Sequence, residues 1–86
     1  MTEARQKAKE RFEIRSYEID SRINQILFDL DNADDVEVLE AHLHLISSHL
    51  ENYRELQMKG IDVLPFDYDG LYALQCALFN KLFDLY

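Results

Sequence analysis

The sequence contains very few residues that break helices. Its one proline and two glycines, Pro65, Gly60 and Gly70, all come after residue 59. The stretch before residue 60 therefore holds no residue whose backbone alone ends a helix. The chain shows no internal repeat, and no strand-like alternation longer than a few residues. We therefore expect an all-α fold.

Cysteine and long apolar runs are also scarce. The single cysteine, Cys76, excludes an internal disulfide and suits a reducing compartment. No apolar run approaches the ~20 residues of a membrane-spanning helix. The first residues, MTEARQKAKERFE, contain no apolar core of a signal peptide. We therefore expect a soluble cytoplasmic protein. A length of 86 residues suits one small domain, so we expect a single domain over residues 1–86.

Basic residues are outnumbered by acidic ones, nine against seventeen, which gives a formal net charge of −8. This balance argues against non-specific binding to nucleic acid or to an anionic membrane. The charge is unevenly distributed, because residues 1–22 hold six of the nine basic residues and only five of the acids. The remainder of the chain is strongly acidic.

The spacing of apolar residues predicts three helices, at about residues 2–30, 34–59 and 68–85. In the first two, apolar residues recur at steps of three and four, which is typical of one buried helix face. Residues 1–10 carry few apolar side chains and are expected to fray. The first face consists of Phe12, Ile19, Ile23, Ile26 and Leu30, with Ser16 as a polar interruption. The second consists of Val36, Leu39, Leu43, Ile46, Leu50 and Tyr53.

These two faces match each other when their helices run antiparallel. If Leu30 faces Val36, the register carries each apolar residue onto an apolar partner, except at Ser16, until Phe12 faces Tyr53. One turn further, Lys9 faces Gln57, so both faces become polar together. Two unrelated helices need not agree in this way, so the agreement predicts an antiparallel helical hairpin.

The ends of the predicted helices carry capping residues. Asp34, followed by Glu37, resembles a capping box at the start of the second helix, and Asn32 with Asp35 is the rival pair. Gly60 is expected to end this helix in a left-handed conformation.

The next residue, Ile61, should then contact Leu56, as in a Schellman motif. After the connection that contains Pro65, either Asp67 or Asp69 should cap the third helix.

The third helix carries two apolar lines where a small domain needs only one buried face. We expect the leucine line to fill the core and the aromatic line to form an interface, most simply that of a homodimer. In two alternatives, the aromatic line binds a different protein, or Val63, Leu64 and Phe66 fold back over it. The leucine line is Leu71, Leu74, Leu78, Leu82 and Leu85. The aromatic line is Tyr72, Cys76, Phe79, Phe83 and Tyr86.

The sequence offers no complete set of metal ligands. Glu40 and His44 have the spacing of a helical ligand pair, but no second pair accompanies them. His42 and His49 lie seven residues apart, too far along a helix to share an ion. The segment Asp67–Gly70 resembles part of a calcium loop with Gly70 at the sixth position. Pro65 and Cys76 would then occupy the first and twelfth positions of the loop, which need acidic ligands. We expect no metal and no cofactor.

No catalytic constellation is present either. Cys76 lacks a nearby base, so we interpret it as a small buried hydrophobic residue. Nothing places two carboxylates in an apolar cleft, as acid–base chemistry requires. We therefore expect a non-catalytic protein that acts by binding other proteins.

The densest group of acids surrounds the predicted turn between the first two helices. Such a group can imitate nucleic-acid phosphates and bind a basic protein that handles nucleic acid. Small inhibitors from phage and mobile elements, including some anti-CRISPR proteins, act in this way, and the likeness is one of size and charge alone. The alternative is that the acids serve helix capping and solubility. The acids are Asp29, Asp31, Asp34, Asp35, Glu37 and Glu40.

Two other hypotheses remain. One is a structural or adaptor protein that acts through its apolar third helix. The other is a hairpin that binds nucleic acid through Arg5, Lys7, Lys9 and Arg11, against the net charge. In the hairpin register these four cations lie beside the end of the second helix, where they can offset its dipole and nearby acids instead.

Overall fold

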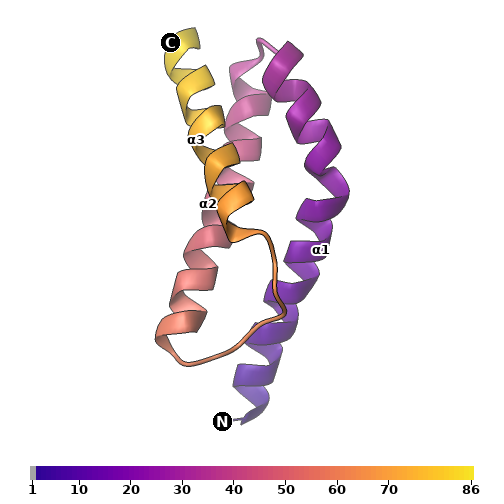
Figure 1. The fold of residues 1–86 in the computed structure, drawn as a ribbon, viewed down its shortest axis with the longest axis vertical. Coiled ribbons are helices and arrows are strands. Elements are labelled where there is room, and N and C mark those ends of the chain that lie inside the picture. The colour runs from indigo at the N-terminus through magenta and orange to yellow at the C-terminus, as the bar shows by residue number, and fades with distance from the viewer. Residues whose placement is uncertain (1) are drawn as a thin grey trace.

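The computed structural model describes residues 2–86 as three α-helices, α1 (Thr2–Asn32), α2 (Val36–Met58) and α3 (Tyr68–Leu85). The described residues contain no strand, so the predicted all-α fold is confirmed. α1 and α2 form the predicted antiparallel hairpin, and α3 packs chiefly against α2 with little contact to α1 (Figure 1). The molecule measures 45 × 22 × 20 Å, and α3 covers only the upper half of the hairpin.

The main core lies where the three helices meet. The predicted hairpin faces supply Ile19 and Ile26 from α1 and Leu39, Ile46 and Leu50 from α2. The leucine line of α3 completes the core, as predicted, except that its last member is exposed at the end of the helix. The buried leucines are Leu71, Leu74, Leu78 and Leu82.

The turn between α1 and α2 differs from the prediction in its details. α1 continues to Asn32 and α2 begins at Val36, so the turn still spans three residues but lies two residues further along the chain than the sequence suggested. Asp35, and not Asp34, caps α2, because its carboxylate accepts a 3.0 Å hydrogen bond from the backbone N–H of Glu37. Of residues 1–10, which were expected to fray, residues 2–10 belong to the regular helix α1, and Met1 lies outside the described residues.

α2 ends in the predicted Schellman motif. Gly60 has a φ of +71°, a left-handed conformation that strains other residues. The backbone N–H of Gly60 donates to the carbonyl of Gln57 at 3.0 Å, and that of Ile61 donates to Leu56 at 2.9 Å. Ile61 and Leu56 are both buried with Phe12 in a second apolar cluster at the lower end of the hairpin.

The connection from α2 to α3 follows the lower part of the hairpin (Figure 1). Val63 and Phe66 pack against the second cluster. Leu64 is exposed, and its backbone N–H donates to the Glu13 carboxylate at 2.9 Å. The suggestion that this segment folds back over the aromatic line is therefore wrong, because its apolar side chains are used at the other end of the molecule.

Asp67 is the N-cap of α3, which confirms one of the two predicted caps. Its carboxylate accepts a 2.9 Å hydrogen bond from the backbone N–H of Gly70. A Cβ atom at Gly70 would clash with the Asp67 carboxylate, so any other residue at this position would displace the cap. None of the helices within residues 2–86 is long and apolar enough to cross a membrane.

Candidate functional site

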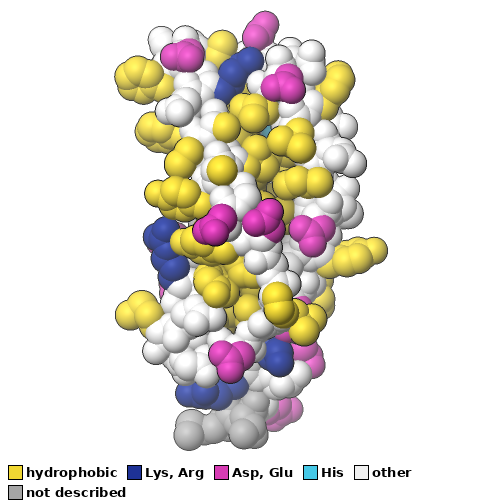
Figure 2. Space-filling view, in the orientation of Figure 1, with side chains coloured by type: hydrophobic (Ala, Val, Ile, Leu, Met, Phe, Trp, Pro, Cys, Tyr) yellow, Lys and Arg dark blue, Asp and Glu magenta, His cyan; other side chains and the backbone are white. Residues whose placement is uncertain are grey.

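The aromatic line of α3 lies on the surface. Phe79, Phe83 and Tyr86 are 61%, 72% and 76% exposed, and Tyr72 is exposed as well. Hydrophobic side chains project along the outer edge of α3 in Figure 2. Cys76, which we interpreted as buried, is also exposed, because docking of the leucine line turns its side of the helix toward solvent. The described chain thus leaves this line uncovered.

A groove of about 320 Å³ runs beside this line, between α2 and α3. Below it, Gln75 of α3 donates a 2.8 Å hydrogen bond to the Ser47 hydroxyl of α2, which fixes the two helices against each other. Desolvation raises the pKa of Tyr86, and the neighbouring Glu40 carboxylate adds to this effect. The groove is lined by Glu40, Leu43, His44 and Ser47 of α2 and by Phe79, Leu82, Phe83 and Tyr86 of α3.

The predicted acidic turn lies at the same end of the molecule as this groove. In Figure 1 the α1–α2 turn and the C-terminus both lie at the top. Glu40 belongs to the acidic set and also lines the groove, so it joins the two predicted surfaces. The sequence placed these sets on separate helices and gave no reason for them to meet.

Two of the six predicted acids have structural partners. Asp29 is half-buried and accepts hydrogen bonds from His42 Nε2 at 2.7 Å and from Gln25 Nε2 at 2.9 Å. The bond from His42 lowers the pKa of Asp29, although burial opposes it. Asp35 caps α2. The other four acids, Asp31, Asp34, Glu37 and Glu40, are exposed, as is Asp35.

A buried histidine lies in the seam of the hairpin. His49 is 1% exposed, and its Nε2 shares a 2.8 Å hydrogen bond with the Ser16 hydroxyl. Its ring stacks on Phe12, with 4.1 Å between centroids. Burial lowers the pKa of His49, and the nearby Arg15 lowers it further. Ser16, the one polar interruption of an apolar face, was the signal that a polar partner faces it.

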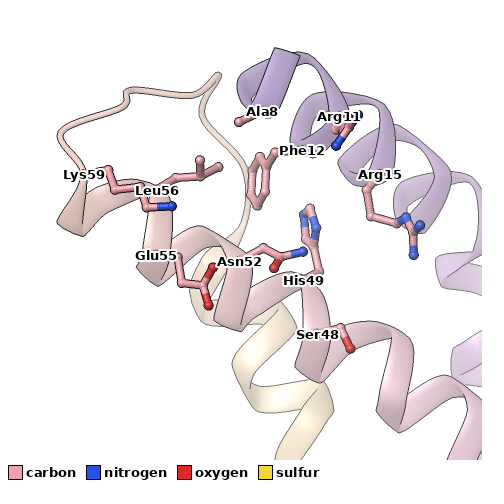
Figure 3. A pocket seen from close by; sticks show the side chains of 10 residues that line it. All are labelled: Ala8, Arg11, Phe12, Arg15, Ser48, His49, Asn52, Glu55, Leu56 and Lys59. Atoms are coloured by element: carbon pink, nitrogen blue, oxygen red, sulfur yellow. The ribbon is translucent and has the colours of Figure 1, made fainter. Parts of the chain in front are cut away.

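Beside this histidine, α1 and α2 enclose a second hollow, of about 350 Å³, in the lower half of the molecule (Figure 3). The rings of Phe12, from α1, and His49, from α2, meet between the two helices, and Arg11 and Arg15 extend from α1 at the edge of the hollow. The sequence had assigned Arg11 to the N-terminal cations. Two others of that group, Arg5 and Lys9, border Ile61 and Asp62 beyond the end of α2, as the hairpin register predicted.

The three histidines have different surroundings. His42 pairs with Asp29, His49 with Ser16, and His44 lines the groove beside α3. Within residues 2–86, no three side chains of histidine, cysteine, aspartate or glutamate form a group that could hold a metal ion. Comparison of the chain with protein-family models, with curated proteins and with solved structures finds no match.

Proposed function

We propose that this protein is a non-catalytic binding module whose upper end docks on a basic surface of another protein. The proposal rests on one observation. Exposed aromatic residues and exposed carboxylates lie close together around the groove between α2 and α3. An apolar centre with a charged rim is the usual composition of a protein-binding surface. The aromatic side chains of Phe79, Phe83 and Tyr86 supply the apolar part.

The carboxylates favour a basic partner. Asp31, Asp34 and Glu37 are exposed at the turn, and Glu40 is exposed at the edge of the groove. Charged groups at the rim of an interface steer association with a surface of the opposite sign. Proteins that handle nucleic acid present such basic surfaces, and carboxylates here would take the places of phosphates. The module would then act as a small inhibitor, as some anti-CRISPR proteins do, and the likeness to them is one of size and charge only.

The length of the aromatic line supports a second candidate, self-association of the free chain. The line includes Tyr72 and Cys76 and therefore extends beyond the groove along most of α3. A two-fold dimer would use the same patch twice and cover it. In such a dimer, binding of a partner through the groove requires the two copies to separate.

The test is recovery of binding proteins from a lysate by purified variants, with identification by mass spectrometry. Asp31→Lys combined with Asp34→Lys should release the partner that the original protein retains, and rising salt should do the same. Phe83→Glu should also release it. A matched charge control is Glu3→Lys combined with Glu10→Lys, which makes the same change in net charge at the opposite end.

Each result has a distinct meaning. A partner lost on charge reversal at the turn, but kept in the control, supports the proposal. A partner that resists salt and charge reversal but is lost with Phe83→Glu supports an adaptor that acts through α3 alone. Recovery of nucleic acid itself, sensitive to Arg5→Gln, supports the hypothesis of the basic N-terminus. A partner kept by every variant contradicts this choice of surface.

A further inference from the structure

The hollow beside His49 has a local charge opposite to that of the whole protein. Arg11 and Arg15 reach it from α1, and Lys59 reaches it from the end of α2. Glu55 is the one acidic residue in its lining, so the lining carries a formal charge of +2 in a chain of −8.

The cations of this lining are available to a ligand. Within residues 2–86, neither Arg11 nor Lys59 forms an ion pair. Arg15 lies 3.5 Å from Glu18 on its own helix, with both side chains about half exposed. Such a surface pair contributes little free energy and is easily exchanged for a better one.

The floor of the hollow is apolar and aromatic, with one polar group left unpaired. Ala8, Phe12 and Leu56 line it, and the His49 ring stacks on Phe12. His49 Nδ1 is buried and has no hydrogen-bond partner among the described residues. A buried polar atom without a partner costs about 1–3 kcal/mol, so its presence requires an explanation, and a role in binding is one. The side chain of Asn52 adds a neutral hydrogen-bonding group to the same wall.

We propose that this hollow binds a small phosphate monoester that carries a compact apolar or aromatic group. A phosphate monoester has a charge of about −1.5 to −2 near pH 7, which complements the charge of the lining. The guanidinium groups of Arg11 and Arg15 are suited to phosphate, because one guanidinium group can bind two phosphate oxygens at once. Lys59, at the other end of the hollow, adds to its positive charge. The volume lies at the lower end of the range for small-ligand sites, and the apolar floor provides space for an organic group.

This binding would be separate from the protein-binding surface proposed above. Arg15 precedes Asp31 by sixteen residues on α1, roughly 24 Å along the helix at a rise of 1.5 Å per residue. Loss of one site should therefore leave the other intact, and each proposal can fail without the other.

The test is a titration of the full chain with phenyl phosphate, followed by nuclear magnetic resonance of backbone amides and the His49 ring. We expect saturable shifts at Arg11, Arg15, His49 and Lys59. Arg11→Gln and Arg15→Gln should each weaken binding about tenfold, the loss of one charge-assisted hydrogen bond. Arg5→Gln, which removes an exposed cation of the same helix outside the hollow, should bind as the original does.

Two further probes define the ligand class. Inorganic phosphate should bind more weakly than phenyl phosphate, and phenol should not bind measurably. Absence of saturable shifts with phenyl phosphate overturns the proposal, as does equal weakening by Arg5→Gln. Equal affinity for inorganic phosphate and phenyl phosphate overturns the assignment of an organic ester. Circular dichroism of each variant ensures that a lost signal reflects lost binding in a folded chain.

Discussion

At the scale of single residues, the hydrogen bond between His49 and Ser16 places a polar pair in the hairpin seam, beside the ring of Phe12. A polar pair among apolar side chains restricts the register, because a shift of the helices would bury both groups without partners. Ser16 therefore interrupts the apolar face where the facing helix supplies a histidine. The pair helps to specify how α1 and α2 align.

His49 should make the stability of the protein depend on pH. Because its pKa in the folded chain lies below the usual value of 6.5, the unfolded chain binds a proton more readily. The free energy of unfolding should thus decline as the pH falls from about 6.5 toward the lower folded pKa, and remain level above that window. We expect urea unfolding of His49→Gln to lack this part of the decline. Parallel slopes for the two proteins between pH 7 and 5 would contradict the prediction.

The cap of α3 gives a second prediction for single residues, from the pair Asp67 and Gly70. Asp67→Ala should lower the free energy of unfolding by about 1 kcal/mol, the usual effect of losing an N-cap. Gly70→Ala should also destabilise, because its Cβ would displace the Asp67 carboxylate. In the Asp67→Ala background the same change should stabilise by up to about 1 kcal/mol, because alanine favours helix over glycine. Thermal unfolding of the four proteins measures this reversal of sign, and additive effects would contradict it.

At the scale of elements, the hairpin depends on one face of α1. Ile19 is fully buried between the helices, whereas Ile14 is 60% exposed on the opposite side of α1. We expect Ile19→Ala to reduce the free energy of unfolding by about 2–5 kcal/mol, because it leaves a cavity in the seam. Ile14→Ala, the same change on the same helix, should alter it by no more than about 0.5 kcal/mol. Denaturant titration of both variants tests the register, and similar losses would exclude it.

The placement of α3 follows from the contacts at its beginning and along its leucine line. Arg54 of α2 donates to the hydroxyl of Tyr68 at 3.2 Å, and Gln75 donates to Ser47 about two turns later on α3. Tyr68 in turn packs near Tyr53 and Phe66. These polar and aromatic contacts rotate α3 so that the leucines enter the core. The aromatic line stays exposed because it lies on another side of α3, which no other helix of the described chain covers.

At the scale of the whole molecule, the two ends differ in chemistry. The upper end combines carboxylates with exposed aromatic residues, and the lower half holds the cationic hollow beside His49. If the free chain self-associates through the aromatic line, light scattering should give a mass near twice 10.2 kDa. Phe83→Glu should then restore the single mass without loss of helix, because Phe83 lies outside the core.

The control for this prediction is Tyr17→Glu, which changes another exposed aromatic residue, on α1. It should leave the mass unchanged. A soluble monomer at high concentration would rule out self-association and leave the groove to a different protein. Unfolding of Phe83→Glu would contradict the exposed position of the aromatic line.

The sequence by itself determined the features that depend on local chemistry. Helical periodicity predicted three helices and the facing sides of α1 and α2, because a buried face repeats every 3.6 residues. Gly60 was identified as a helix end, and Asp67 as one of two candidate caps, because backbone conformation and capping act within a few residues. The leucine line was assigned to the core on the same grounds.

Only the tertiary structure decided which groups distant in sequence meet. The docking of α3 exposed Cys76 and brought the aromatic line to Glu40, and the fold paired Asp29 with His42. The burial of His49 and the gathering of Arg11, Arg15 and Lys59 likewise require two helices at a fixed distance and rotation. Such contacts depend on how whole helix faces pack, and side-chain spacing along one helix does not contain that information.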